Sequence, residues 1–223
     1  MRQAGPAGAG RCRDREREPL AALGSARDDG QARLSVEVYL ARHGETEWSL
    51  SGRHTGKTDL PLTSNGEAKA ARLKAPLQKM HFDVVFSSPL QRATRTAELA
   101  GFPAPELTDL LREVDYGEYE GLTTKEIRES RPGWDLYKDG CPGGETPAQI
   151  YSRAMDFIKL ASADSGRVLA FSHGHFLRAV AIAWMRLDVT AASTLDLDVA
   201  TLSLLRDDER GRVLAMWNSS PSV

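Results

Sequence analysis

The stretch from Val36 to Trp48 reads VEVYLARHGETEW and joins an apolar run to a group of ionisable residues. The β-branched, aromatic and leucine side chains at 36–40 predict a strand. Strands usually end in turns of small or neutral polar residues, but here Arg42 and His43 follow directly. A fixed positive charge beside a titratable imidazole at a strand end is typical of a functional site. Alone, His43 fits a solvated turn residue equally well, so a second observation is needed.

A second stretch, RVLAFSHG at 167–174, repeats this order of apolar strand, polar residue, histidine and glycine. The two stretches bring His43 and His173 to the carboxyl ends of two strands. If these strands are neighbours in one parallel sheet, both imidazoles reach one crevice, because such sheets bind ligands outside the carboxyl ends of their strands. The repetition favours a shared site over chance placement.

Strand and helix signals alternate along the rest of the chain. Ser64 with Glu67 is a capping-box signature, and Ser88 with Pro89 predicts a helix start directly after a strand. The expected elements are a strand at 36–40, a helix from 64, a strand at 82–88, a helix ending at Gly101, a helix at 146–161, a strand at 167–174, a helix at 175–185, and strands at 200–208 and 212–218. This order predicts an α/β fold, a three-layer sandwich in which helices flank a largely parallel sheet.

Arginines at the strand-to-helix junctions indicate the chemistry of the crevice. Arg42 precedes His43, and Arg92 lies in the first turn of the helix that follows the strand at 82–88. Guanidinium groups stay charged and bind tetrahedral oxyanions through paired hydrogen bonds, so the sequence predicts a phosphoryl site. The helix starts at Ser88 and Gly174 are expected to add backbone N–H groups for the anion.

Phosphoryl transfer needs an attacking group and a proton for the leaving oxygen. A neutral imidazole can supply the first and a carboxylic acid the second. In the stretch LLREVDYGEYEG at 110–121, the apolar pair is expected to end another strand and so bring Glu113 to the crevice. The sequence does not separate Glu113 from three rivals, which are Asp115, Glu118 and Glu120. Any of these four residues also fits a solvated loop carboxylate.

A zinc site is the alternative interpretation, since His43, His173 and His175 with an acid resemble a ligand set for that metal. The charges of Arg42 and Arg92 would oppose a dication at the same place. We therefore expect no metal and no cofactor.

The composition limits the class of partner. A chain of 223 residues suits one domain, and its formal net charge of -2 argues against nucleic acid or an anionic membrane as a partner. No apolar run approaches the roughly 20 residues of a membrane helix. With Cys12 and Cys141 as the only cysteines, a reducing cytoplasm is expected and a disulfide framework is not. The expected partner is a small phosphorylated substrate, and the sequence indicates no oligomeric state.

The first 33 residues differ from the rest of the chain. They are rich in Gly, Ala and Arg with mixed acids and show no sustained periodicity. We expect residues 1–33 to be a disordered N-terminal extension. The segment has too many acidic residues for a transit peptide, and the alternative origin is an upstream extension from a misplaced start codon. Residues 34–223 are expected to form the functional domain.

Four motifs together resemble the signatures of the histidine phosphatase, or phosphoglycerate mutase-like, superfamily. They are LARHGETEW (40–48), SSPLQRATRTAE (87–98), LREVDYGEYEG (111–121) and FSHGHFLRAV (171–180). The resemblance implies that His43 is the nucleophile that becomes phosphohistidine, while Arg42, Arg92 and His173 hold the phosphoryl oxygens. Glu113 would protonate the leaving alcohol and then activate water. These roles require a neutral His43 and a protonated Glu113 in the first step.

Longer stretches resemble a branch of small phosphatases that includes sedoheptulose-1,7-bisphosphatases and acid phosphatases. They are EWSLSGRHTGKTDLPLT (47–63), LREVDYGEYEGLTTKEIR (111–128) and WDLYKDGCPGGET (134–146). The likeness implies hydrolysis of a phosphorylated metabolite of carbohydrate metabolism, with a sugar bisphosphate such as sedoheptulose 1,7-bisphosphate as the expected substrate. The substrate would be lined by His54, Thr55, Gly56, Ser88, Tyr116 and Gly174, with Arg178 at a distal phosphate and Ser49 where other branches have asparagine.

Two other functions remain open within this resemblance, a phosphoglycerate mutase and a broad-specificity acid phosphatase. Mutases of the family carry a long basic insertion after the acid motif, whereas here only 114–146 separate Glu113 from the next helix, which favours hydrolysis. A non-catalytic binding protein would not need all of the ionisable residues that are present. The segment at 131–147, with its aromatic, Gly and Pro residues, fits either a wall near the site or an ordinary packed loop.

Overall fold

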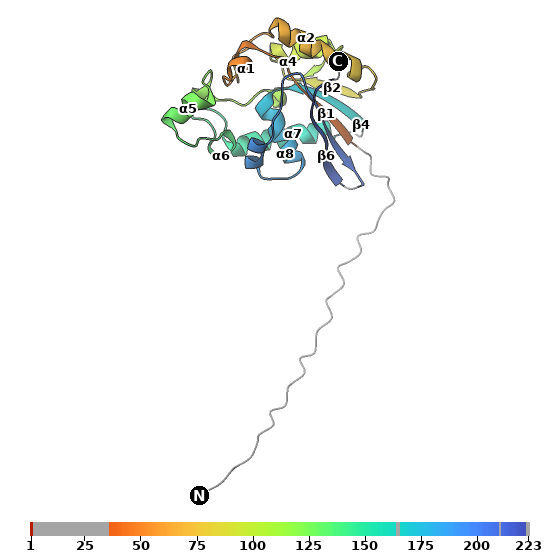
Figure 1. Ribbon diagram of the computed structural model, residues 1–223. Coiled ribbons are helices and arrows are strands. Elements are labelled where there is room, and N and C mark those ends of the chain that lie inside the picture. The colour runs from red at the N-terminus through yellow and green to blue at the C-terminus, as the bar shows by residue number, and fades with distance from the viewer. Residues whose placement is uncertain (2–35, 164–165, 210, 222–223) are drawn as a thin grey trace. The chain divides into compact units, whose positions relative to one another are not determined.

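The computed structural model describes residue 1 and residues 36–163, 166–209 and 211–221 (Figure 1). Of the predicted extension at 1–33, only Met1 is among them, so the expectation of disorder there lies outside the described residues. None of the helices within these ranges combines the length and apolar character that a bilayer crossing requires.

The described strands form one six-stranded sheet in the order β3-β2-β4-β1-β5-β6. The strands are β1 (Val36–Arg42), β2 (Val84–Ser87), β3 (Glu106–Leu107), β4 (Gly166–Ser172), β5 (Leu202–Asp208) and β6 (Gly211–Ser219). The neighbours β3, β2, β4 and β1 are parallel, and β5 and β6 are added antiparallel at one edge. The prediction of a largely parallel sheet within an α/β fold is confirmed.

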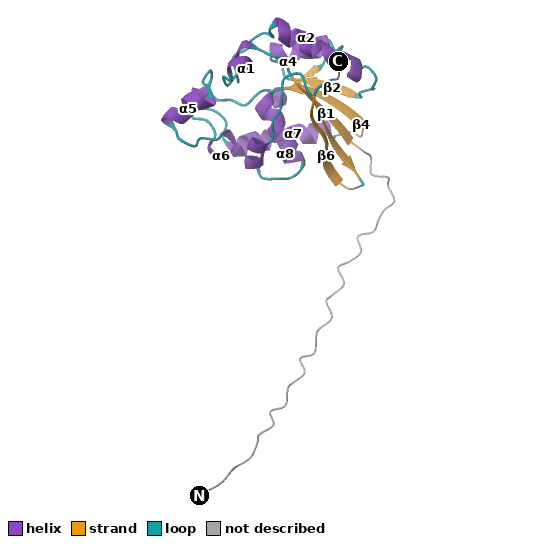
Figure 2. Cartoon of the chain, viewed as in Figure 1, coloured by secondary structure: helices purple, strands orange, loops and turns teal. Residues whose placement is uncertain are grey.

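Helices cover both faces of this sheet, which gives the predicted three layers (Figure 2). The helices are α1 (Glu47–Ser51), α2 (Ser64–Arg72), α3 (Lys74–Leu77), α4 (Gln91–Leu99), α5 (Thr124–Ser130), α6 (Leu136–Asp139), α7 (Pro147–Ala161) and α8 (Gly174–Trp184), with the short 3-10 helices η1 (Asp109–Leu111), η2 (Gly117–Tyr119) and η3 (Val189–Thr194). Val38 and Leu40 of β1 join a core with α7 and α8, whereas Leu169 and Phe171 of β4 join a second core with α3 and α4. The alternation of side chains along a strand accounts for these two cores.

The neighbouring β1 and β4 explain why the two histidine motifs meet. The strands pair in parallel with Arg42 opposite Ser172, and the backbone N–H of His43 donates to the carbonyl of Ser172 over 2.9 Å. The two parallel strands therefore end on the same side of the sheet, and each histidine directly follows the carboxyl end of its strand.

Two predicted helix caps are wrong, for reasons that the tertiary contacts supply. The side chain of Thr63, not Ser64, accepts the N–H of Gly66 at the start of α2. Helix α4 begins at Gln91 instead of Pro89, and Gln91 donates its N–H to Asp59 over 2.9 Å. The hydroxyl of Ser88, the expected cap, accepts the N–H of Leu90 over 3.3 Å, one residue before α4 begins, and also contacts His173.

The segment between β3 and α7 also differs from the prediction. The residues before Glu113 form the 3-10 helix η1 and not the end of a strand. Further along, Trp134 and Tyr137 are almost fully buried and belong to the core below the pocket, with the hydroxyl of Tyr137 donating to the carbonyl of His175 over 2.8 Å. No residue of 131–147 is among those that line the pocket described below, so the segment is a packed loop and not a wall of the site.

Candidate active site

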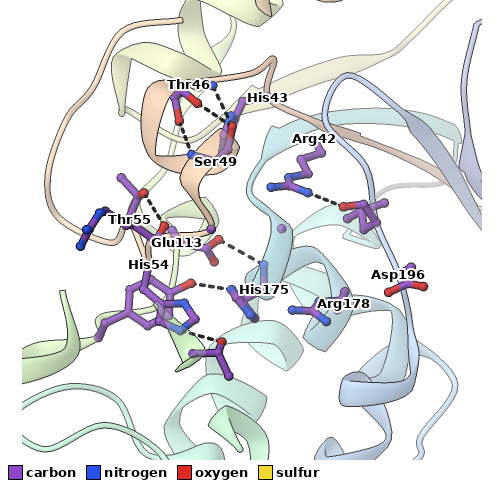
Figure 3. Close-up of a pocket in the computed structure, with 16 residues that line it drawn as sticks. Arg42, His43, Thr46, Ser49, His54, Thr55, Glu113, His175, Arg178 and Asp196 are labelled. Carbon is purple, nitrogen blue, oxygen red and sulfur yellow. Dashed lines mark hydrogen bonds between the residues drawn. The ribbon is translucent and has the colours of Figure 1, made fainter. Parts of the chain in front are cut away.

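A pocket of about 300 Å³ lies at the carboxyl ends of β1 and β4 (Figure 3). It is lined by Arg42, His43, Thr46, Ser49, Gly52, Arg53, His54, Thr55, Glu113, Tyr116, Thr124, Gly174, His175, Arg178, Asp196 and Leu197. Four residues predicted for the site are absent from this lining: Gly56, Ser88, Arg92 and His173. Their contacts show what each does instead.

His43 is held as a neutral imidazole with one fixed proton. Its Nδ1 lies 2.6 Å from the carbonyl oxygen of Gly44. Because a carbonyl only accepts, Nδ1 must carry the proton, and the lone pair of the neutral ring is on Nε2. Burial lowers the pKa of His43 well below its usual value, and the charges of Arg92 and Arg42 lower it further. The ring therefore keeps a nucleophilic nitrogen at neutral pH.

His173 lies beside His43, with 5.1 Å between the ring centroids. Its Nδ1 accepts from Nε of Arg92 over 3.0 Å, and its Nε2 lies 2.8 Å from the hydroxyl of Ser88. With Nδ1 as the acceptor, the proton of the neutral ring is on Nε2. Burial is the main cause that lowers the pKa of His173, and Arg92 adds to it. Ser88 thus orients His173 from behind the pocket.

The guanidinium of Arg92 donates its hydrogen bonds to other groups of the protein. Besides His173, its Nη1 donates to the carbonyl of Thr58 over 2.9 Å, and Nη2 donates to the carbonyls of Thr55 and Gly56 over 2.9 and 3.2 Å. Its side chain is fully buried. In this structure Arg92 fixes His173 and the loop at 55–58, which carries part of the pocket wall.

Arg42 has an orphaned donor at the pocket. One Nη donates to the carbonyl of Leu197, whereas the buried Nε has no hydrogen-bond partner. Buried donors of a charged group are seldom left unpaired, so an incoming anion is the natural partner. A Cβ on Gly174 would lie 3.1 Å from both Nε and Cζ of Arg42, so glycine at this position leaves room for the guanidinium.

Glu113 is the one of the four candidate carboxylates that lines the pocket. Its Oε1 accepts the N–H groups of Val114 and Phe176 over 2.9 and 2.8 Å, and Oε2 accepts that of His175 over 3.1 Å. With two donors on Oε1 and one on Oε2, the latter has more capacity left to exchange a proton. Glu113 also occupies N–H groups at the start of α8 that were predicted to bind phosphate, and Asp59 does the same for α4.

Two of the three rival carboxylates have other partners, and Glu118 does not line the pocket. Asp115 forms an ion pair with Lys57 at 2.7 Å. Glu120 accepts the N–H groups of Gly56 and Thr58, each over 3.0 Å. It thus binds the same loop whose carbonyl groups accept from Arg92. Gly56 consequently faces Glu120 and not the pocket, which corrects the predicted substrate contact. A Cβ there would lie 2.5 Å from the carbonyl oxygen of Val114.

An aromatic group forms the pocket wall opposite His43. His54 stacks on Tyr116 with centroids 4.7 Å apart, and the hydroxyl of Tyr116 lies 2.6 Å from Nδ1 of His175. Burial and the charge of Arg178 lower the pKa of His54 to about 4. The same two causes lower the pKa of His175 well below its usual value. Both rings are therefore neutral at pH 7.

The far side of the pocket carries Arg178 and Asp196. Nη1 of Arg178 donates to the carbonyl of Leu195 over 3.1 Å, and its guanidinium lies 5.5 Å from the ring centroid of Tyr137. Both Arg178 and Asp196 line the pocket, as Figure 3 shows. A cation and a carboxylate together can bind a second anionic group and a hydroxyl of one ligand.

Ser49 lines the pocket, but its hydroxyl is engaged within α1. Its Oγ accepts the N–H of Thr46 over 2.8 Å and donates to the carbonyl of the same residue over 2.9 Å. Several lining residues were not predicted for the phosphoryl or substrate site: Thr46, Gly52, Arg53, Thr124, His175, Asp196 and Leu197. The capping-box pattern of Thr46 with Ser49 could have indicated a helix there, while Asp196 and Leu197 follow no motif.

The histidines do not form the alternative zinc site. His173 contacts Arg92 and Ser88, whereas His175 turns to Tyr116. Within the described residues, no three His, Cys, Asp or Glu side chains are grouped to hold a metal ion. Burial raises the pKa of the Cys141 thiol to about 12, so this cysteine is a poor nucleophile.

The α/β sheet and a neutral, buried imidazole beside guanidinium groups define an enzyme that handles phosphate esters. The model of the histidine phosphatase superfamily (branch 1) matches residues 38–220, so the chain belongs to this superfamily. It is a histidine phosphatase, an enzyme of the phosphoric monoester hydrolase class.

Individual relatives agree with this assignment. An acid phosphatase of Mycobacterium tuberculosis is 43% identical over 183 residues, which are 80% of this chain and 90% of the relative. Sedoheptulose 1,7-bisphosphatase of Saccharomyces cerevisiae is 35% identical over 189 residues, 70% of each chain. A solved structure of an open reading frame product from Mycobacterium tuberculosis superposes with a TM-score of 0.81 at 41% identity and covers 84% of this chain and 99% of its own.

Proposed function

We propose that the protein hydrolyses phosphate monoesters without a metal, through a phosphohistidine at Nε2 of His43. The observation that supports this most directly is the hydrogen bond from Nδ1 of His43 to the carbonyl of Gly44, because it leaves the Nε2 lone pair available. The unpaired Nε of Arg42 is at hand for a phosphoryl oxygen. Residues 34–223 form the catalytic domain in this proposal, and the protein acts in the cytoplasm.

The reaction would proceed in two steps. In the first, Nε2 of His43 attacks phosphorus, the bond to the ester oxygen breaks, and Glu113 gives its proton to the leaving alkoxide. In the second, Glu113 takes a proton from water, the resulting hydroxide attacks phosphorus, and inorganic phosphate leaves His43. Arg42 stabilises the charge that develops on the phosphoryl oxygens. His173 contributes in this proposal by exchanging the contact of its Nε2–H with Ser88 for a phosphoryl oxygen. Arg92 acts through His173 by fixing its orientation.

The substrate is proposed to be a small sugar phosphate with a second phosphate. Arg178 supplies a cation and Asp196 an acceptor for a hydroxyl on the pocket wall. The names of the relatives, an acid phosphatase and a sedoheptulose 1,7-bisphosphatase, agree with a phosphatase and with a sugar bisphosphate as one candidate.

Phosphate release in the presence of EDTA tests the reaction. We expect the unmodified protein to remain active, whereas His43→Ala loses turnover because no nucleophile remains. The substrates are sedoheptulose 1,7-bisphosphate, fructose bisphosphates, 3-phosphoglycerate and p-nitrophenyl phosphate. Retained activity in His43→Ala, or loss with EDTA that added metal restores, contradicts the proposal. Formation of 2-phosphoglycerate from 3-phosphoglycerate would instead establish a mutase, and weak, equal rates would indicate a broad acid phosphatase.

Arg178→Ala tests the second phosphate. If this guanidinium binds a distal phosphate, the variant loses far more kcat/KM on a sugar bisphosphate than on p-nitrophenyl phosphate. Only the bisphosphate has a second phosphate whose contact with Arg178 is lost. Steady-state kinetics on both substrates measure the difference. Equal losses on the two would refute this role for Arg178.

A further inference from the structure

An ion pair lies directly behind the segment that carries Glu113. Arg153, in α7, meets Glu145, which precedes that helix, through two parallel hydrogen bonds: Nε to Oε1 and Nη2 to Oε2, each 2.8 Å. The two side chains are only 17% and 18% exposed. Neither lines the pocket, and the mechanism proposed above uses neither.

The same pair grips the backbone on both sides of Glu113. Nη1 of Arg153 donates to the carbonyls of Leu110 and Arg112 over 3.0 and 2.7 Å. On the other side, Oε2 of Glu145 accepts the N–H of Asp115 over 2.9 Å, and the N–H of Glu145 donates to the carbonyl of Asp115 over 2.8 Å. The chain is therefore held immediately before and after the acid.

Arg153 also contacts the residue that binds the carboxylate of Glu113. Its guanidinium lies 4.0 Å from the ring centroid of Phe176, within the range of a cation–π contact. The backbone N–H of Phe176 donates to Oε1 of Glu113 over 2.8 Å. One planar, rigid group thus touches both the backbone of Glu113 and the anchor of its side chain.

We propose that Arg153 and Glu145 are positioning residues that set the placement of Glu113 for proton transfer to the leaving group. The inference rests on the proposed function, in which Glu113 is that proton donor. Proton transfer requires heavy atoms within about 2.6 to 3.2 Å, so a small displacement of the carboxylate slows it. Phosphoryl binding by Arg42 and His43 does not depend on this pair.

Leaving-group dependence separates positioning of an acid from general support of the fold. An alkyl phosphate needs a proton on its departing oxygen, whereas p-nitrophenolate departs without one. The measured quantity is kcat/KM, which reports the step that breaks this bond. We expect Arg153→Met to lower kcat/KM for the alkyl phosphate by about 10- to 10²-fold, and that for p-nitrophenyl phosphate by less than about threefold. Arg153→Lys should behave similarly, because one ammonium cannot replace the planar fork.

Two further variants bracket the result. Glu113→Gln removes the proton donor and should show the same selectivity to a greater degree. Arg167→Met is the matched control: Arg167 pairs with Glu37 at 2.7 Å and lies 5.8 Å from the ring of Tyr39, at the opposite ends of β1 and β4 from the pocket. We expect Arg167→Met to leave the ratio of the two kcat/KM values unchanged.

The possible outcomes separate the positioning role of Arg153 and Glu145 from the role of Glu113 as proton donor. A selective Glu113→Gln with an Arg153→Met that lowers both substrates equally, or neither, refutes the positioning role alone. A Glu113→Gln that is not selective refutes Glu113 as the donor, and the inference falls with it. If Arg153→Met does not fold, as judged by circular dichroism, Glu145→Gln decides by the same ratio, since it weakens the clamp while keeping a hydrogen-bonding group.

Discussion

At the scale of single residues, the chemistry depends on groups whose partners fix one proton arrangement. Gly44 and Gly174, the glycines of the two histidine motifs, serve different purposes. The carbonyl of Gly44 selects the tautomer of His43, and a Cβ at this position would lie 2.5 Å from the carbonyl oxygen of Gly66. Gly174 instead leaves room for the guanidinium of Arg42. Two identical dipeptides thus carry two different physical constraints.

Gly174→Ala tests the second constraint. The added Cβ would lie 3.1 Å from Nε and Cζ of Arg42, so the guanidinium must shift by a few tenths of an ångström. We expect kcat/KM to fall by about 10-fold while the melting temperature is unchanged or higher, because alanine favours the helix.

Ser64→Ala is the control, since it introduces alanine at the start of the exposed first turn of α2, away from the pocket. It should leave kcat/KM unchanged. A Gly174→Ala variant with full activity would show that Arg42 tolerates the displacement or does not contact the phosphoryl group.

At the scale of elements, the loop at 54–58 is fixed by side chains that bind both its N–H groups and its carbonyl groups. Arg92 of α4 donates to its carbonyls and Glu120 accepts its N–H groups. This arrangement connects the orientation of His173 with the position of His54 and Thr55 in the pocket wall. The start of α4 thereby serves the site through side chains and not through its free N–H groups, one of which Asp59 occupies.

Arg92→Lys tests this connection. Lysine keeps the charge but cannot donate to His173 and three carbonyls at once, so we expect kcat/KM to fall on the order of 10²-fold and amide exchange in 54–58 to accelerate. Glu120→Gln is the companion variant, because Glu120 holds the same loop without touching His173. Faster exchange with a much smaller kinetic loss is expected there, and equal kinetic losses would assign the effect of Arg92 to the loop alone.

At the scale of the whole molecule, three buried histidines and the partly buried His175 make folding depend on pH. Burial lowers the pKa of His43, His173 and His175 well below the usual value and contributes most to lowering that of His54 to about 4. In the unfolded chain these rings take up protons near pH 6.5. As the pH falls below 6.5, the unfolded chain therefore binds more protons than the folded one, and the free energy of unfolding decreases.

Urea unfolding at pH 7.5 and pH 5 measures this effect. For His54 alone, with a pKa of about 4 in the fold, the loss amounts to about 2 kcal/mol at pH 5. We expect His54→Phe to reduce the pH dependence by that amount, because the replacement keeps a ring against Tyr116 and has no titration. An unchanged slope in His54→Phe would contradict a low pKa for His54.

The sequence determined the order of the longer elements, the parallel centre of the sheet and the two strand–histidine–glycine stretches, because these depend on the local pattern of apolar side chains. The short elements α1, α3, α5, α6 and β3 were not predicted. Glu113 became a leading candidate through resemblance, but sequence periodicity did not separate it from Asp115, Glu118 and Glu120. Strand β5 and the edge strand β6 run antiparallel to their neighbours, which the strand signals alone did not indicate.

Only the tertiary structure decided which polar groups are occupied. Arg92 meets His173 across 81 positions of the chain, and Glu113 takes the N–H of Phe176 across 63, so no local pattern reveals these bonds. At the helix starts predicted to bind an anion, Asp59 accepts one N–H group of α4 and Glu113 accepts two of α8, and these bonds too join distant segments. Local physics sets where strands and helices form, but satisfaction of buried polar groups depends on distant segments that meet only after folding.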